Sequence, residues 1–221
     1  MKIIFAATPD ISISCLEEIL NSSHEIGLIL TMPDKPTGRG KKFLPGPIKK
    51  FCLENNLPFV QPKNLKSIEV KNIFKEVESD LLIVFAYGKI IPKDIFNLPT
   101  YGSINVHTSI LPSWRGAAPI QRAIINGEKF TGITFMKLSE GLDEGPIIES
   151  FKVAIEEEET SGSLAEKMAK VSSREILQTI ENIELNNIIY TEQDHSKASY
   201  ADKLLKSESC IAWDKKAEII K

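Results

Sequence analysis

Long apolar runs are missing from this sequence. No stretch approaches the ~20 consecutive apolar residues that a membrane-spanning helix needs, so we expect neither a membrane span nor a membrane partner. The first apolar stretch, residues 2–7, stops at Thr8-Pro9-Asp10 and is too short for the apolar core of a signal peptide. The sequence therefore favours a cytoplasmic protein in which residues 2–7 form a buried strand.

Cysteine and histidine are also scarce. The three cysteines are Cys15, Cys52 and Cys210, and the three histidines are His24, His107 and His195. No two cysteines form a CxxC pair and the histidines are widely spaced, so the spacing gives no local support for a metal site. We expect reduced thiols, which suit the cytoplasm, and no bound metal.

Two phosphate-binding signatures are absent. The sequence has no GxxxxGK[ST] loop and no GxGxxG after its first strand, so a nucleoside-triphosphate or dinucleotide site is unsupported. The net charge of −3 lacks the basic excess of many nucleic-acid-binding proteins. Residues 33–50, however, hold six Lys or Arg residues against the single Asp34, a local charge of +5. This segment, rich in Pro and Gly, predicts a long irregular loop that either only aids solubility or grips phosphates.

Strand and helix patterns alternate through the first 130 of the 221 residues. Such alternation predicts an α/β fold, a Rossmann-like, mostly parallel open sheet with helices on both faces. A later strand pair could add antiparallel edge strands. The expected strands are 2–7, 25–31, 57–61, 80–86 and 102–107, the helices are 10–20, 47–53, 70–77 and 117–126, the later pair is 131–138 and 147–155, and a long helix spans 161–184.

The regular pattern ends near residue 188. Residues 191–207 are polar and show no clear periodicity, which is typical of a linker. Residues 210–213 form a small apolar anchor, and 217–221 read as the start of a helix. We therefore expect one domain over 1–189, and a linker with the start of a further domain over 190–221.

One group of polar residues could carry chemistry. Asn105 and His107 are two apart at the end of an expected strand, so both side chains point to one face, where open α/β sheets place their ligands. Asp143 lies in the Gly-bounded loop 141–145. An amide and an imidazolium can stabilise the oxyanion of acyl transfer, and a carboxylate can orient the imidazole and take a proton. The other interpretation is a structural Asn-His pair and an ordinary turn aspartate.

Eight motifs, in order along the chain, together resemble the methionyl-tRNA formyltransferase family. The resemblance covers essentially the whole chain. It identifies formyl transfer from 10-formyltetrahydrofolate as the reaction class, while the longest motif and the basic one are more specific to the tRNA enzymes. The motifs are ATPD at 7–10, PDKP at 33–36, GRGKK at 38–42, VFAYG at 84–88, INVHTSILPSWRGAAPIQR at 104–122, GLDEG at 141–145, TSGSL at 160–164 and SYADKL at 199–204.

The resemblance implies roles for individual residues. Asn105 and His107 would hold and polarise the formyl carbonyl, and Asp143 would position His107 and serve the proton transfers. The acceptor would be the α-amine of methionine on initiator tRNA, in translation initiation, and the enzyme would be a cytoplasmic monomer. The folate-binding residues would be Ser109, Ile110, Leu111 and Pro112 with Phe85, Tyr87 and Gly88, and the tRNA-binding residues would be Gly38, Arg39, Gly40, Lys41 and Lys42.

The chain departs from the family pattern in a few places. Ala7 replaces a usual glycine, and Thr108 and Ile110 are mild changes. Family members usually continue into a C-terminal β-barrel domain, which we expect to be missing beyond the linker, so that tRNA affinity would be weak. The alternatives are a formyltransferase acting on glycinamide ribonucleotide or an amino-sugar nucleotide, and a non-catalytic RNA- or folate-binding remnant.

Overall fold

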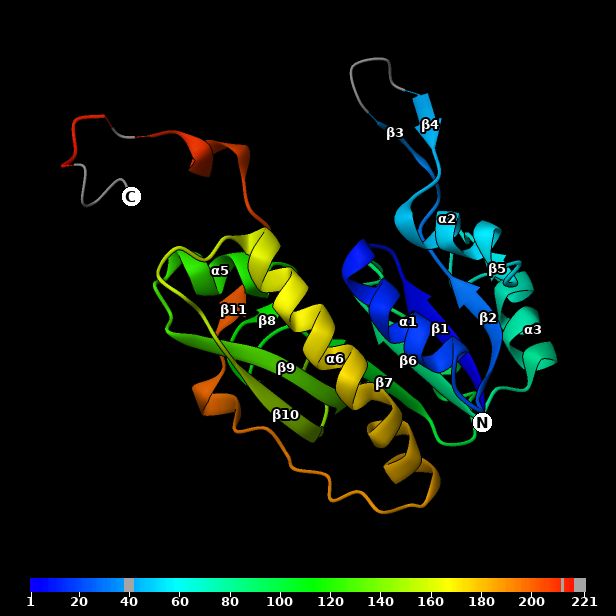
Figure 1. Cartoon of the computed structure of the whole chain (residues 1–221). Helices are drawn as coiled ribbons and strands as arrows, with labels where there is room; N and C mark the ends of the chain where they lie inside the picture. The colour runs from blue at the N-terminus through cyan, green and yellow to red at the C-terminus, as the bar shows by residue number, and fades with distance from the viewer. Residues whose placement is uncertain (38–41, 212, 217–221) are drawn as a thin grey trace.

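The computed structural model describes residues 1–37, 42–211 and 213–216, and in these residues a seven-stranded sheet forms the centre of the molecule (Figure 1). Its order is β10-β9-β7-β6-β1-β2-β5. The strands from β5 to β7 run parallel, whereas β9 and β10 are antiparallel to their neighbours, as the sequence predicts. The strands are β1 (Lys2–Ala7), β2 (Glu25–Leu30), β5 (Phe59–Val60), β6 (Leu81–Phe85), β7 (Ser103–His107), β9 (Phe130–Lys137) and β10 (Ile147–Ala154).

The strand order reverses at β1. From β1 the chain moves outward to β2 and β5, then returns to the other side of β1 as β6 and continues to β7. This reversal creates a switch point between the carboxyl ends of β1 and β6, where open α/β sheets bind their ligands.

Helices cover both faces of the sheet (Figure 1). Ile3 and Phe5 pack into an apolar cluster with residues of α1 and α6, whereas Ile4 and Ala6 pack into a second cluster with α3 and α4. Because successive strand residues point to opposite faces, a strand covered on both sides is apolar throughout. The helices are η1 (Asp10–Ser12), α1 (Ile13–Leu20), α2 (Pro47–Glu54), α3 (Ile68–Val77), α4 (Lys93–Phe96), α5 (Pro119–Ile125) and α6 (Ser161–Glu184).

The long helix α6 has the predicted bounds. The Thr160 hydroxyl accepts from the Ser163 N–H at 3.1 Å, and the Ser163 hydroxyl accepts from the Thr160 N–H at 3.0 Å. This reciprocal capping satisfies two N–H groups that a helix start leaves free. The helix therefore begins where the sequence places its capping hydroxyl.

The prediction that residues 33–50 lack regular structure before the helix at Pro47 is wrong. β3 (Lys35–Thr37) and β4 (Lys42–Leu44) form an antiparallel pair with Pro36 opposite Phe43. Strand pairing satisfies backbone groups whatever the side chains are, and an isolated pair has open edges where a proline is tolerated. The short helix α4 was also not predicted, because four residues show no period.

The segment after α6, expected to be a linker, contacts the rest of the molecule. β11 (Tyr200–Ala201) pairs in parallel with β8 (Arg115–Gly116), and Ala201 is buried. Two short helices, η2 (His195–Lys197) and η3 (Lys206–Ser209), flank this pair. Backbone pairing of this kind leaves no periodic pattern in the sequence, so the sequence did not predict these contacts. The division into domains near residue 190 stays a prediction. No helix in the described part of the chain is long and apolar enough to span a bilayer.

Candidate active site

A cavity of about 1300 Å³ opens at the carboxyl ends of β6 and β7. Its walls are residues 84–91 after β6, 105–108 at the end of β7, 138–143 after β9, and parts of the β8 and β11 segments. The cavity thus lies at the switch point of the sheet. Since ligand pockets usually measure about 300–1,000 Å³, this cavity has room for more than one reactant.

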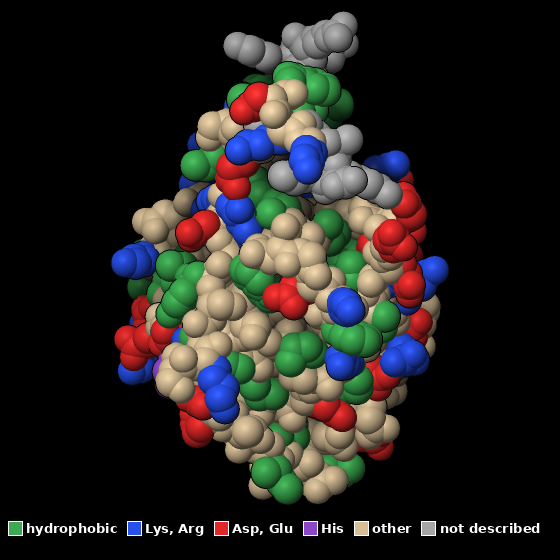
Figure 2. Space-filling view, turned by 90° about the vertical axis from the view of Figure 1, so that its left-hand side faces the viewer, with side chains coloured by type: hydrophobic (Ala, Val, Ile, Leu, Met, Phe, Trp, Pro, Cys, Tyr) green, Lys and Arg blue, Asp and Glu red, His purple; other side chains and the backbone are tan. Residues whose placement is uncertain are grey.

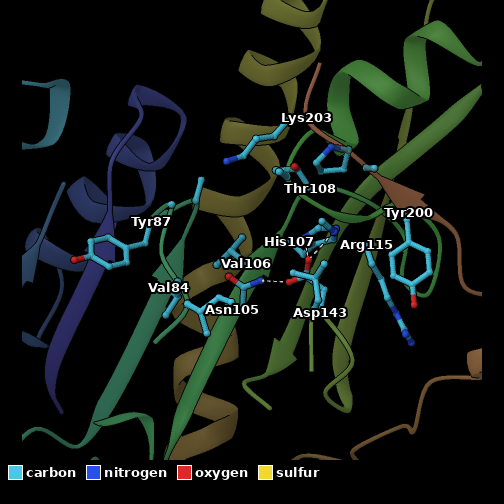
Figure 3. A pocket seen from close by; sticks show the side chains of 18 of the residues that line it. Val84, Tyr87, Asn105, Val106, His107, Thr108, Arg115, Asp143, Tyr200 and Lys203 are labelled. Atoms are coloured by element: carbon cyan, nitrogen blue, oxygen red, sulfur yellow. Dashed lines mark hydrogen bonds and ion pairs between the residues drawn. The ribbon is translucent and has the colours of Figure 1, made fainter. Parts of the chain in front are cut away.

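Asn105, His107 and Asp143 meet in this cavity, and their side chains point toward one another (Figure 3). The Asn105 Nδ2 donates to Asp143 Oδ1 at 3.3 Å, and His107 Nδ1 lies 3.6 Å from Asp143 Oδ2. The backbone N–H of Gly116 also donates to Asp143 Oδ2, at 2.8 Å. The structure therefore brings together the three residues that the sequence singles out, 38 positions apart along the chain at the widest.

The surroundings of His107 fix the orientation of its ring. The Nε2 atom lies 2.8 Å from the carbonyl oxygen of Trp114. A carbonyl can only accept, so Nε2 carries a hydrogen. The carbonyl is turned toward the ring by a backbone φ of 62° at Trp114. Nδ1 is thus the nitrogen left for Asp143 and for proton exchange, and His107 itself is buried at 5% exposure.

The loop that carries Asp143 depends on glycine. A Cβ at Gly145 would lie 1.8 Å from the Lys137 carbonyl oxygen, so no side chain fits there. Asp143 itself has a φ of 51°, a left-handed conformation that Asp adopts more readily than most residues. The close approach of the loop to β9 explains the glycine at position 145.

The residues expected to bind folate divide into two groups. Phe85, Tyr87 and Gly88 line the cavity, although the buried Tyr87 hydroxyl has no hydrogen-bond partner among the described residues and points away from Asp143 (Figure 3). Ser109, Ile110, Leu111 and Pro112 are not part of the lining. They form a turn behind it, where the Ser109 hydroxyl donates to the Ser113 carbonyl at 2.6 Å and Leu111 N–H donates to the Thr134 hydroxyl at 3.2 Å. Their role in folate binding stays a prediction.

The expected tRNA-binding residues fall largely outside the described part of the chain. Gly38, Arg39, Gly40 and Lys41 lie outside the described residues, and of Lys42 only the backbone, in β4, is described. The face of the molecule over β10 carries interspersed acidic and basic side chains without dominance of one sign (Figure 2). Within the described residues, no group of three or more His, Cys, Asp or Glu side chains is placed to hold a metal ion.

Arg115 and Gln193, two residues next to the Asp143 loop, escaped the sequence reasoning. Arg115 is 1% exposed, and its Nε and Nη2 donate to Gln193 Oε1 at 3.1 and 2.7 Å. The exposed His195 lies 3.3 Å from Arg115 Nη1 through its Nδ1. Arg115 lies inside the longest motif, so the sequence could have suggested a role for it at the site. The polar segment around Gln193 offers no such signal.

The comparisons with known proteins agree with this geometry. Residues 1–180 match the family model described as formyl transferase. The whole chain is 46% identical to a methionyl-tRNA formyltransferase of Dictyoglomus thermophilum and 41% identical to one of Marinobacter nauticus, and spans 70% and 71% of their lengths. A solved phosphoribosylglycinamide formyltransferase from Bacillus halodurans is 27% identical with a TM-score of 0.66, over 84% of this chain and 95% of that one. The chain therefore belongs to the formyl transferase family.

Proposed function

We propose that this chain transfers the formyl group of 10-formyltetrahydrofolate to the α-amino group of methionine on initiator tRNA, a step of translation initiation. The observation that carries the proposal is the contact between Asn105, His107 and Asp143 inside a large cavity at the switch point. The tRNA as acceptor is supported by the relatives that match the whole chain at 41–46% identity, which are methionyl-tRNA formyltransferases.

The cavity suits a folate in size and chemistry. Its volume of about 1300 Å³ exceeds that of an ordinary pocket, and apolar side chains such as Val84, Phe85 and Val106 form part of its wall. Bound folate supplies a formyl group on a nitrogen that can leave. With the formyl group already activated in this way, the protein needs no nucleophilic Ser or Cys. Its residues have to orient the two reactants and polarise the formyl carbonyl.

Asn105 and His107 would stabilise the charge that develops on the formyl oxygen. The amide of Asn105 carries two hydrogens, and Asp143 accepts one of them. The second hydrogen remains for a carbonyl oxygen. His107 gains a second donor when Nδ1 is protonated, since Nε2 is already engaged by Trp114. Donors that are held in place beforehand stabilise an oxyanion strongly.

Asp143 would serve the proton transfers of the reaction. Its carboxylate accepts from the Asn105 amide and the Gly116 N–H, and lies beside His107 Nδ1. A carboxylate so placed can orient the imidazole and can accept a proton from the attacking amine, directly or through a water molecule. The new bond joins the amine nitrogen to the formyl carbon, the bond from that carbon to the folate nitrogen breaks, and the amine proton is passed to the departing nitrogen.

Several finer expectations belong to the same proposal. The basic loop with Arg39, Lys41 and Lys42 would contact the acceptor end of the tRNA, and the cationic side chains of Arg122 and Lys203 line the cavity. Residues 1–189 would form the catalytic domain and 190–221 the linker and the start of a further domain. The enzyme would act as a cytoplasmic monomer without a metal.

A second candidate acceptor is glycinamide ribonucleotide. The similarity to a solved phosphoribosylglycinamide formyltransferase favours it, although the identity is only 27%. That enzyme is matched over 95% of its own length, so the shared fold alone does not separate a small acceptor from a tRNA.

The test offers the same donor to three acceptors in parallel. Purified chain is incubated with 10-formyltetrahydrofolate and either methionyl initiator tRNA, glycinamide ribonucleotide or an amino-sugar nucleotide, and formylated product is measured by mass. We expect product on the charged tRNA, and none on uncharged tRNA. Formylation of a small acceptor without formylation of the tRNA would overturn the assignment of the acceptor, and absence of product on all three would overturn formyl transfer itself.

A further inference from the structure

A residue beyond the long helix reaches the loop of Asp143. Gln193 lies in the polar segment after α6, yet it is only 5% exposed. Its Nε2 donates to the backbone carbonyl of Asp143 at 2.9 Å and to that of Gly145 at 2.7 Å. One side-chain amide therefore holds the two peptide carbonyls that flank the turn behind the Asp143 carboxylate.

Backbone pairing delivers Gln193 to this position. Thr191 and Ile147 exchange two backbone hydrogen bonds, at 2.8 and 2.9 Å, two residues before Gln193. On the other side, Arg115 N–H donates to the Ser199 carbonyl at 2.8 Å, next to the β8–β11 pair. The segment is thus fixed at both ends, and Gln193 is held where the Asp143 loop passes over it.

Arg115 determines which end of the Gln193 amide faces the loop. Two guanidinium N–H groups of Arg115 donate to Gln193 Oε1. A guanidinium has only donors, so the atom that faces it must be the amide oxygen. The amide nitrogen is then turned toward the carbonyls of Asp143 and Gly145. Arg115 also lies 3.4 Å from Glu144 Oε1, inside the same loop.

The Asp143 loop needs such support. Asp143 adopts a left-handed backbone conformation with φ 51°, and conformations of this kind persist at functional sites only where the surroundings hold them. The carboxylate contacts Asn105 at 3.3 Å and Gly116 N–H at 2.8 Å. Rotation of the peptide planes at 143 and 145 would move the carboxylate away from both groups and from His107.

We infer that Gln193, oriented by Arg115, is a positioning residue for Asp143, so that the segment after α6 forms part of the catalytic apparatus. Gln193 touches backbone and not the reacting atoms. It acts by holding the carboxylate in line with Asn105 and His107. This inference rests on the proposed formyl transfer, in which Asp143 has a catalytic role. The contacts of Gln193 that support the inference do not depend on which acceptor is used.

Two substitutions separate positioning from simple anchoring. In Gln193→Glu the oxygen that accepts from Arg115 is kept, but the donor to the two carbonyls is lost. In Gln193→Met both functions are lost. Gln178→Glu on the exposed side of α6, where the amide bonds only to Glu181 and Asn182 among the described residues, is the matched control. Each variant is checked for folding by circular dichroism and thermal unfolding.

We expect Gln193→Glu and Gln193→Met to lower kcat by about 10- to 100-fold, with KM for both substrates changed less than threefold, because small displacements of a catalytic group cost that much. For Gln193→Glu the loss of kcat should become smaller toward acid pH, since a protonated carboxyl group regains one hydrogen-bond donor to the loop carbonyls. Gln178→Glu should match the unaltered chain. A Gln193→Glu variant with unaltered kcat, or with only a raised KM, would overturn the inference.

Hydrogen exchange keeps the test independent of activity. Peptides covering residues 139–146 should exchange faster in both Gln193 variants than in the unaltered chain and in Gln178→Glu. Unchanged exchange there would overturn the positioning role even if turnover falls. If the unaltered chain formylates no acceptor, the proposed function fails, whereas the exchange result still decides whether Gln193 holds the loop.

Discussion

Asn105 and Gln193 are both amide side chains that hold Asp143, yet they come from regions of opposite kinds. Asn105 stands on β7, a strand with other strands bonded on both sides, and its amide reaches the carboxylate itself. Gln193 stands in a polar segment without regular structure and reaches the backbone of the loop. The residue that would contact substrate thus belongs to the rigid sheet, and the residue that supports it belongs to the segment wrapped around the sheet.

The two regions should also differ in how easily they open. β7 lies inside the sheet with Ile104 and Val106 in one apolar cluster, so we expect its hydrogen bonds to break only when the domain unfolds. The segment from 191 to 209 is fastened by the short β8–β11 pair, by the Thr191–Ile147 bridge and by Arg122. Such a segment can open locally, so we expect a change in β7 to lower turnover more than a change in the segment.

The largest effect is expected for Asn105. Replacing it in Asn105→Ala removes a donor to the developing oxyanion and a partner of Asp143, and kcat should fall by about 10²- to 10³-fold. Steady-state formylation of methionyl initiator tRNA measures this fall in kcat. The control is Asn187→Ala, an exposed asparagine just after α6, which should leave turnover unchanged. Turnover of Asn105→Ala near that of the unaltered chain would contradict the catalytic role of Asn105.

Periodicity accounts for what the sequence predicts well. The strand at 2–7 and the helix at 161–184 have the predicted bounds, because one is a continuous apolar run and the other begins at a capping hydroxyl. Asn105 and His107 were expected on one face of a strand, and they do face the same cavity. These features depend on side-chain patterns, which a sequence displays directly.

Backbone pairing accounts for what the sequence conceals. The β3–β4 pair, with Pro36 in one strand, and the β8–β11 pair are formed by main-chain groups that every residue possesses. The burial of Gln193 depends on Arg115, 78 positions away. The turn at Ser109–Pro112 illustrates a third case, since the resemblance implies a folate contact for residues that lie behind the cavity wall in this structure.

Alkaline pH should destabilise the core rather than the later segment. Burial on α1 raises the pKa of the Cys15 thiol from 9.0 to about 12. Because the folded pKa is the higher one, this stability is fully present below pH 9 and is lost as the pH rises toward 12, by up to ~1.4 kcal/mol per pH unit. The difference in unfolding free energy between the unaltered chain and Cys15→Ala should therefore narrow over this range in urea titrations. Cys210→Ala, at an exposed thiol, should show a constant difference, and parallel curves for Cys15→Ala would contradict the assignment.

The smallest effect is expected where Arg122 bonds to residues 202–208 of the segment. Its Nη1 and Nη2 bond to Glu208 at 2.6 and 3.1 Å, and its Nε donates to the Asp202 carbonyl at 3.0 Å. Exposed ion pairs contribute little and are weakened by salt, so Arg122→Gln should leave thermal unfolding of the domain nearly unchanged while residues 202–209 exchange hydrogen faster at low salt. High salt should reduce the difference from the unaltered chain. The control Lys71→Gln removes an ion pair to Asp94 elsewhere and should not alter exchange in 202–209. If Arg122→Gln instead speeds exchange in β7 as much as in 202–209, the two regions open together and their separation into rigid sheet and locally opening segment is wrong.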